Sequence, residues 1–175
     1  IITGKTKPDY GTAWFGQNFN LLMHTEDEIA RAGVGRKFQK PTVFENLTVF
    51  QNLELAMDGD KRVFRLLFAK MSASEKESID IVLERINLSS QKGAYAGSLS
   101  HGQKQWLEIG MLLMQNAQLL LIDEPAAGMT HQEIDKTADL LQTLKKEHTV
   151  VVVEHDMDFV RSLESPVTVL HQGSV

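Results

Sequence analysis

The strongest constraint on the fold is a short aliphatic run that ends in two acidic residues and a proline. Residues 119–122 read Leu-Leu-Leu-Ile, and Asp123, Glu124 and Pro125 follow directly. A run of this length is typical of a fully buried strand. Because proline cannot donate to a sheet ladder, we expect the strand to end at the two carboxylates. The sequence therefore predicts a buried strand with an acidic C-terminal end.

A polar turn precedes this strand. Residues 99–103 read Leu-Ser-His-Gly-Gln, and the largely apolar run 106–114 that follows is long enough for a helix. Ser100 and Gln103 have the spacing of a capping box, in which each side chain bonds the backbone N–H of the other residue. One interpretation is therefore purely structural: the turn starts a helix, and the two acids face water where the strand leaves the core.

Composition excludes several classes of protein. With 175 residues, of which 42% are hydrophobic, the chain can bury one sizeable core. A formal net charge of -5 without a basic block argues against a nucleic-acid-coating protein. The absence of cysteine excludes disulfides and thiolate metal sites. No apolar run approaches the ~20 residues that a membrane-spanning helix needs.

The rest of the chain alternates between strand and helix patterns. The β-branched run 149–153 suits a central parallel strand that is covered on both faces. Such alternation predicts an α/β fold with a parallel sheet, in which ligands bind beyond the C-terminal strand ends, where Glu124 and His155 stand. We expect further strands at 12–16, 34–38 and 167–171, and helices at 26–31, 131–147 and 156–163.

Residues 42–98 are rich in helix signals. Thr48 with Gln51, and Ser74 with Glu77, have capping-box spacing, and a further helix is expected at 61–70. A polar connection with two glycines, residues 87–97, closes the segment. The sequence therefore predicts a helical subdomain, 42–98, inserted into an α/β core made of residues 1–41 and 99–175.

The residues at the strand ends suit phosphate chemistry. Hydrolysis of a nucleotide γ-phosphate needs a positioned water, a metal and hydrogen-bond donors. Asp123 suits Mg²⁺ held through its water shell, and Glu124 can accept a proton from the attacking water. His155 can donate to the γ-phosphate. A lone histidine at a strand end is more often structural, but its Val-Val-Glu-His context and its distance from the two acids favour the functional interpretation here. Gln39 can ligate the metal or orient the water through its amide.

The polar turn provides a second group of candidates. Ser100, Gly102 and the first amides of their helix form an anion site of the helix-N-terminus type. In this order and spacing, the turn and the acidic strand end resemble the signature motif and Walker B of ATP-binding-cassette (ABC) ATPases. The residues that match the family are Gln39 of the Q-loop, Ser100 to Gln103 of the signature loop, Asp123 and Glu124 of Walker B with its catalytic carboxylate, and His155, the switch histidine.

The resemblance implies a fold, cofactors and an assembly. The fold is a P-loop NTPase-like parallel sheet with an inserted helical subdomain, and the cofactors are ATP and Mg²⁺. Family members form a head-to-tail dimer, in which Ser100, Gly102 and Gln103 would complete the nucleotide site of the opposite subunit.

This chain also departs from the family pattern. His101 stands where the family usually has glycine, and residues 127–130 read Ala-Gly-Met-Thr where its D-loop usually reads Ser-Ala-Leu-Asp. Gly4, Lys5 and Thr6 are followed by a turn sequence, so we interpret them as a helix exit and turn. We therefore expect a chain truncated before the Walker A loop, which binds ATP poorly by itself although its parent protein binds and hydrolyses it.

Residues 35–49 resemble importer ATPases of the branched-chain amino acid and urea class, and residues 99–114 and 153–159 favour the urea type. The resemblance implies an ATP-hydrolysing subunit on the cytoplasmic face of a bacterial inner membrane. Its partners would be permease subunits, an identical or different second ATPase subunit and an extracytoplasmic solute-binding protein. The alternatives are a branched-chain amino acid importer, a soluble ABC ATPase and a non-catalytic interaction module; retention of Glu124 and His155 weighs against the last.

Overall fold

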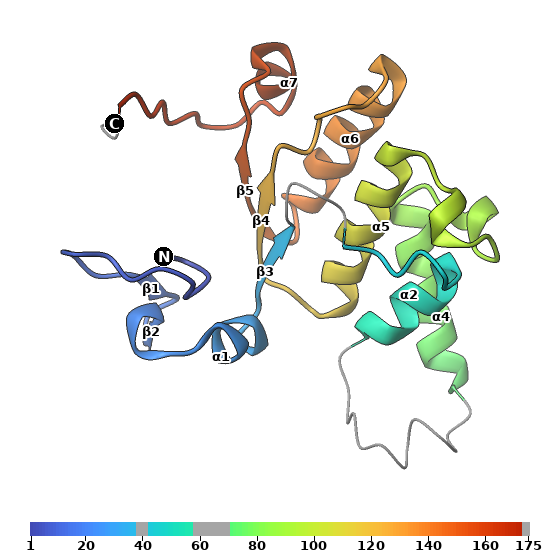
Figure 1. Cartoon of the computed structure of the whole chain (residues 1–175), viewed down its shortest axis with the longest axis horizontal. Helices are drawn as coiled ribbons and strands as arrows, with labels where there is room; N and C mark the ends of the chain where they lie inside the picture. Colours follow the sequence, from blue (N-terminus) through green and yellow to red (C-terminus); the bar gives the residue numbers. More distant parts are fainter. Residues whose placement is uncertain (38–41, 58–70, 173–175) are drawn as a thin grey trace.

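A three-stranded parallel sheet lies at the centre of the computed structural model, which describes residues 1–37, 42–57 and 71–172 (Figure 1). Its strands are β3 (Val34–Lys37), β4 (Leu119–Asp123) and β5 (Thr149–Val153), in the order β3-β4-β5. Leu120 and Ile122 of β4 are buried in the core. The structure therefore confirms the predicted α/β class and the strand before the two acids.

β5 differs from the expectation of a central strand covered on both faces. In the described part of the chain it pairs only with β4, and it forms one edge of the sheet. Val150 and Val152 pack against the core, whereas Val151 and Val153 are exposed. A β-branched apolar sequence favours a strand but does not determine the strand's place in the sheet, which depends on how the other strands pair.

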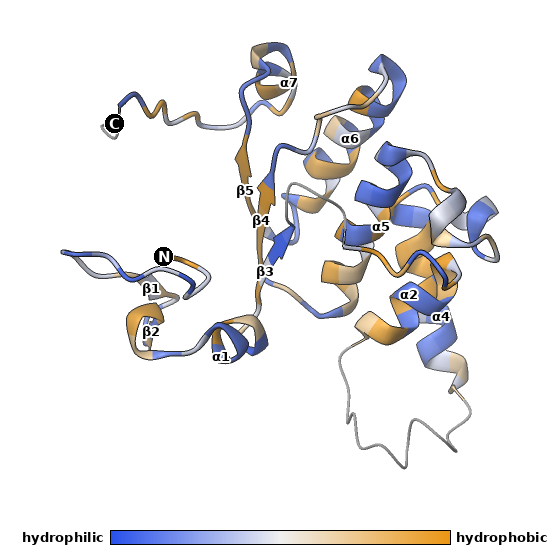
Figure 2. Cartoon of the chain, in the orientation of Figure 1, coloured by the Kyte–Doolittle hydropathy of each residue, from blue (hydrophilic) through white to orange (hydrophobic). Residues whose placement is uncertain are grey.

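Helix α5 (His101–Met114) separates the sheet from a pair of helices, α2 (Val49–Ala56) and α4 (Ala73–Arg85) (Figure 1). One hydrophobic core runs from that pair through α5 to β4 and to α6 (His131–Leu144). Because α5 is enclosed on several sides, its apolar residues are not confined to one stripe (Figure 2). The proposed division into an α/β core and a helical subdomain stays a prediction.

The helix starts follow local hydrogen bonding. Complete capping boxes begin α2 at Thr48 and α5 at Ser100, as predicted. The box of α4 was predicted two residues too late: Ser72 with Glu75, rather than Ser74 with Glu77, caps the helix. Both pairs have the same spacing, so the sequence pattern alone could not choose between them. The helix expected at 61–70 lies outside the described residues.

The N-terminal part forms a small layer whose buried residues Leu21 and Ile29 share a second hydrophobic cluster with Val34 of β3. A hairpin of β1 (Trp14–Phe15) and β2 (Phe19–Asn20) leads through the short helix η1 (Leu21–Met23) to α1 (Glu26–Arg31). The predicted turn at Gly4 is confirmed, because its N–H donates to the Ile1 carbonyl at 2.9 Å and its φ is +80°.

Short 3₁₀ turns η2 (Ser89–Gln91) and η3 (Ala96–Ser98) lie within the predicted polar connection. Helix α7 (Met157–Ser162) follows β5, as expected. The strand predicted at 167–171 is not formed: residues 167–170 belong to no strand, and Val169 and Leu170 are exposed. A β-rich run needs a partner edge for its backbone bonds, and no described strand pairs with this one. None of the helices in the described ranges is long and apolar enough to cross a membrane.

Candidate functional site

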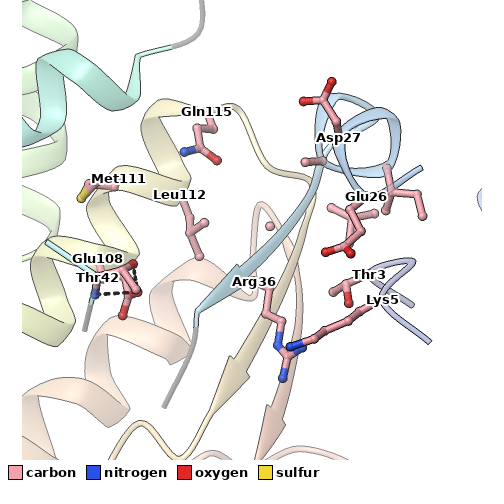
Figure 3. A pocket seen from close by; sticks show the side chains of 14 residues that line it. Thr3, Lys5, Glu26, Asp27, Arg36, Thr42, Glu108, Met111, Leu112 and Gln115 are labelled. Atoms are coloured by element: carbon pink, nitrogen blue, oxygen red, sulfur yellow. Dashed lines mark hydrogen bonds between the residues drawn. The ribbon is translucent and has the colours of Figure 1, made fainter. Parts of the chain in front are cut away.

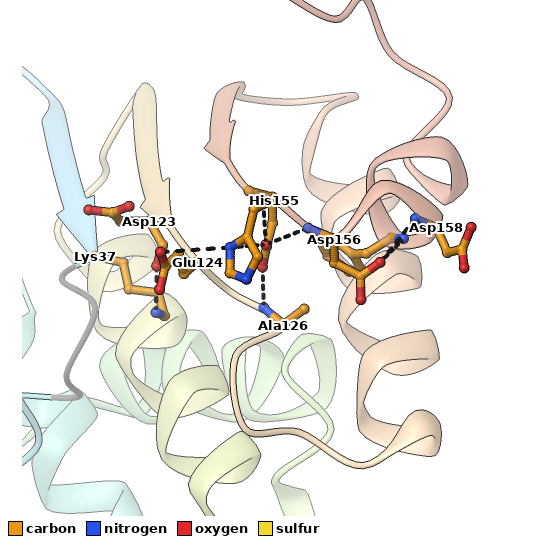
Figure 4. Close-up of polar contacts among 9 residues, drawn as sticks. Lys37, Asp123, Glu124, Ala126, His155, Asp156 and Asp158 are labelled. Carbon is orange, nitrogen blue, oxygen red and sulfur yellow. Dashed lines mark hydrogen bonds and ion pairs between the residues drawn. The ribbon is translucent and has the colours of Figure 1, made fainter. Parts of the chain in front are cut away.

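The two predicted catalytic side chains meet at the C-terminal ends of β4 and β5. The N–H of Glu124 donates to the Val153 carbonyl at 2.9 Å, which extends the ladder one step beyond Asp123. Glu124 has a φ of +46°, a conformation that L-residues adopt rarely and mostly at special sites. His155 Nδ1 lies 3.8 Å from Glu124 Oε1 (Figure 4). The fold thus brings a carboxylate and an imidazole from two separate strands into one site.

Glu154 holds the two strand ends together. Its side chain is only 2% exposed, although the neighbouring imidazole of His155 is 78% exposed. Glu154 Oε1 accepts the N–H of Ala126 at 3.0 Å, and Oε2 accepts the N–H groups of His155 and Asp156 at 2.8 and 3.3 Å. Glu154 was assigned no role from the sequence. An acid at a strand end beside a site residue was the available signal.

Two cations lie beside Asp123. Arg36 Nη2 lies 3.6 Å from Asp123 Oδ2, and Lys37 Nζ donates to the Asp123 carbonyl at 3.4 Å. Lys37 is fully buried, and this burial lowers its pKa against the opposing effect of surrounding carboxylates, of which Glu108 has the largest influence. Lys37 was not predicted from the sequence, because a lysine in a short strand carries no pattern that marks it as buried.

The residues that fit a magnesium ion are few. In the described ranges, no group of three or more His, Cys, Asp or Glu side chains is arranged to hold a metal. Mg²⁺ usually keeps several waters and takes only one or two protein carboxylates together with substrate phosphates. The Asp123 side chain is 36% exposed at a strand end and suits that mode. Gln39, the other predicted ligand, lies outside the described residues.

The predicted anion site occupies the N-terminus of α5. Ser100 Oγ accepts the N–H of Gln103 at 3.2 Å, and Gln103 Oε1 accepts the N–H of Ser100 at 3.0 Å. Ser100 Oγ also donates to Glu133 Oε1 of α6 at 2.7 Å. A Cβ on Gly102 would lie 2.8 Å from that carboxylate, so only glycine fits there without displacement. Ser100 and Gly102 therefore face Glu133 of α6, whereas Glu124 and His155 lie together at the strand ends.

Glu133 was also missed by sequence analysis. The sequence signal was present, because Thr130 and Glu133 have capping-box spacing at the start of α6.

His101 departs from the family pattern. Its Nε2 atom lies 2.8 Å from Gln105 Nε2. Gln105 Nε2 also donates to the Ala127 carbonyl at 3.4 Å. The start of α5 is thus tied to the segment that follows Pro125.

A cavity of about 400 Å³ lies between α1, β3 and α5 (Figure 3). Lys5 and Arg36 line it on one side, and Glu26 and Asp27 contribute acidic groups. Its lining includes neither Glu124 nor His155. The predicted catalytic pair therefore lies outside this cavity, at the C-terminal ends of β4 and β5.

Comparison with known proteins agrees with this architecture. The family model described as "ABC transporter" matches residues 1–127. The chain is 36% identical over 156 residues to the high-affinity branched-chain amino acid transport ATP-binding protein BraF of Pseudomonas aeruginosa, covering 84% of this chain and 61% of BraF. It is 31% identical over 182 residues to the corresponding protein LivG of Escherichia coli, covering 99% of this chain and 71% of LivG.

Solved structures with a similar fold are also ATP-binding cassettes of ABC transporters. A nucleotide-free ATP-binding cassette from an ABC transporter is 28% identical, with a TM-score of 0.72 over 93% of this chain and 66% of that chain. The ADP conformation of MJ1267, an ATP-binding cassette of an ABC transporter, is 29% identical, with a TM-score of 0.73 over 91% of this chain and 65% of that chain. The chain thus spans about two thirds of the length of these proteins. On its sequence motifs, its fold and these matches, the chain belongs to the ABC transporter family.

Proposed function

We propose that this chain is part of the ATP-binding and ATP-hydrolysing subunit of a bacterial importer for branched-chain amino acids. The observation that carries the proposal is the approach of His155 to Glu124, 3.8 Å apart at adjacent strand ends, in a member of the ABC transporter family. The substrate class follows the names of BraF and LivG. These relatives support the branched-chain amino acid alternative better than the urea importer favoured by sequence analysis.

The proposed chemistry assigns one task to each group. Glu124 would accept the proton of the attacking water, and His155 would donate a hydrogen bond to the phosphate that is transferred to that water. Asp123, with Gln39, would hold Mg²⁺, which neutralises charge on the nucleotide phosphates when bound. Ser100, Gly102 and Gln103 would bind phosphate in the opposite subunit of a dimer. The dimeric form of a solved ATP-binding cassette, 25% identical to this chain, supports that assembly.

Gly4, Lys5 and Thr6 form turns and bends rather than a loop between a strand and a helix. We therefore give these three residues no role in phosphate binding. In the complete assembly, the partners would be permease subunits, a second ATPase subunit and an extracytoplasmic solute-binding protein, with the ATPase peripheral to the cytoplasmic face of the inner membrane.

Nucleotide-dependent dimerisation tests the enzymatic part. The intact protein that contains this chain is compared with its Glu124→Gln variant by light scattering and by phosphate release. We expect Glu124→Gln to slow turnover about 10²–10⁴-fold while the ATP-induced dimer persists. The control is Asp158→Asn, an exposed carboxylate on α7. Full turnover by Glu124→Gln would contradict the role given to this carboxylate, and a parent protein that neither binds ATP nor dimerises would contradict the enzyme assignment.

A transport assay tests the substrate. The assembled importer in vesicles is supplied with its binding protein and with leucine, valine or urea. We expect the two amino acids, but not urea, to stimulate ATP hydrolysis and to accumulate. Stimulation by urea alone would reverse the proposed substrate class without affecting the ATPase assignment.

A further inference from the structure

The hydroxyl of Ser100 is already engaged by an acidic side chain of its own chain. Ser100 Oγ donates to Glu133 Oε1 at 2.7 Å, a short bond of the kind that an ionised acceptor forms. The hydrogen bonds from Thr130 and Ser100 lower the pKa of Glu133, so its carboxylate is ionised at neutral pH. The first turn of α6 thus places a negative charge beside the proposed phosphate site of α5.

A serine hydroxyl has a single proton. While that proton is donated to Glu133, Ser100 offers a phosphate oxygen only lone pairs, and two acceptors facing each other do not bond. A phosphate that approaches the N-terminus of α5 must therefore take the Ser100 proton away from Glu133. The two anions compete for one donor.

Other hydrogen bonds hold the Glu133 side chain in its position beside Ser100. Its Oε2 accepts the N–H and the hydroxyl of Thr130 at 3.0 and 2.9 Å, which fixes the side chain at the start of α6. The Glu133 carbonyl accepts the hydroxyl of Thr137 at 2.7 Å, and that hydroxyl accepts the indole N–H of Trp106 on α5 at 2.8 Å. Gly102 lies so close that a Cβ would be 2.8 Å from the carboxylate. Thr130 thus holds the carboxylate, and the helix that carries it is tied to α5 through Thr137 and Trp106.

We infer that Glu133 competes with a nucleotide phosphate for the Ser100 proton, and thereby raises the ATP concentration at which the subunits dimerise. The inference rests on the proposed function and identifies Glu133 as an affinity-determining residue for that site. Glu133→Gln reverses the contact, since an amide N–H can donate to Ser100 Oγ and leave the hydroxyl proton for phosphate. The amide oxygen can still accept the Thr130 N–H, so the cap of α6 is retained.

The chain offers a matched control. In α1, Glu28 accepts the N–H and hydroxyl of Thr25 at 2.8 and 3.2 Å, the same capping arrangement without a signature-loop serine. Glu28→Gln therefore makes the same chemical change in an equivalent cap. Ser100→Ala removes the hydroxyl itself, and combining it with Glu133→Gln tests whether the effect passes through that hydroxyl.

The experiment measures the ATP concentration for half-maximal dimerisation of the intact protein, with Glu124→Gln in every variant to suppress hydrolysis. We expect Glu133→Gln to lower it about fivefold, the effect of one hydrogen bond, and Glu28→Gln to leave it unchanged. Once Ser100 is alanine, Glu133→Gln should change it by less than about twofold. If Glu133→Gln unfolds, as judged by circular dichroism, Glu133→Asp replaces it. Aspartate keeps an acidic acceptor in the first turn of α6, but its side chain is one methylene shorter and withdraws from Ser100, so it should shift the value in the same direction.

Three results would overturn the inference. Glu133→Gln could leave the half-maximal ATP concentration unchanged or raise it. The full shift could persist without the Ser100 hydroxyl, which would identify simple charge repulsion instead. If the parent protein itself does not dimerise with ATP, the proposed function fails and this inference fails with it. If the parent dimerises with ATP but Glu133→Gln leaves the half-maximal ATP concentration unchanged, only the inference fails and the proposed function stands.

Discussion

The carboxylate of Glu154 accepts the backbone N–H of Ala126 at 3.0 Å, and so joins the residue after β5 to the loop after β4. The same side chain binds the N–H groups of His155 and Asp156. Since Glu124 lies two residues before Ala126, a single buried acid fixes both sides of the candidate site. The geometry of Glu124 and His155 therefore depends on a residue that faces away from solvent.

Substitution of Glu154 should lower stability. Glu154→Ala leaves the Ala126 N–H without its acceptor in a partly buried setting, and we expect a loss of about 1–3 kcal/mol in the free energy of unfolding. Glu154→Gln keeps one carbonyl oxygen and should lose less. Urea denaturation followed by circular dichroism measures both, with Asp158→Asn as the exposed control. If Glu154→Ala left the urea midpoint unchanged, the hydrogen bonds of Glu154 would not contribute to stability.

Substitution of His155 should reduce activity and leave stability almost unchanged. Its side chain is 78% exposed, so His155→Ala should change the free energy of unfolding by less than about 0.5 kcal/mol. If it donates to a phosphate, the same substitution should reduce turnover of the intact protein about 100-fold or more. Phosphate release and urea denaturation on one preparation separate the two effects. Wild-type turnover in His155→Ala would refute the proposed role.

Glu108 should give stability a specific pH dependence. Burial raises the pKa of this carboxyl above its ordinary value of 4.5, and its Oε2 atom is buried with no hydrogen-bond partner in the described structure. Between the unfolded and the raised folded pKa, the folded state binds more protons, so this contribution to stability falls as pH rises. Below 4.5 the carboxyl is largely protonated in both states.

Glu108→Gln should remove that dependence. The free energy of unfolding of the variant, relative to the parent, should increase from pH 4 to pH 7 by about 1.4 kcal/mol for each unit by which the pKa is raised. Urea denaturation across this range measures it, with the exposed Glu77→Gln of α4 as the control. A constant difference between variant and parent would show that Glu108 is not desolvated.

Gly110 allows α2 and α4 to pack closely on α5. A Cβ at this position would lie 2.6 Å from Ile86 Cδ1 and 3.1 Å from Leu53 Cδ2. Alanine favours a helix by about 1 kcal/mol over glycine, but the collision with buried side chains should dominate, with a net loss of about 1–3 kcal/mol. Thermal unfolding tests this against Gly93→Ala, whose Cβ would meet nothing within 4 Å. Stabilisation by Gly110→Ala would mean that the three helices can move apart without cost.

Features that depend on neighbours in the chain could be predicted from the sequence. The caps at Thr48 and Ser100 follow from hydrogen bonds between residues three positions apart, so their spacing was sufficient to predict them. The strand at 119–122 followed from its apolar run and Pro125. The approach of Glu124 and His155 was predicted from the rule that parallel strands end on the same side of a sheet.

Features that depend on residues far apart in the sequence could not be predicted in this way. The same β-branched pattern suits a central or an edge strand, and the pairing of β4 between β3 and β5 placed β5 at the edge. The fold buries Lys37. It also brings the carboxylates of Glu154 and Glu133 to backbone and hydroxyl groups far away in sequence. Such contacts leave no periodic signal, because hydrogen-bond partners are set by position in space.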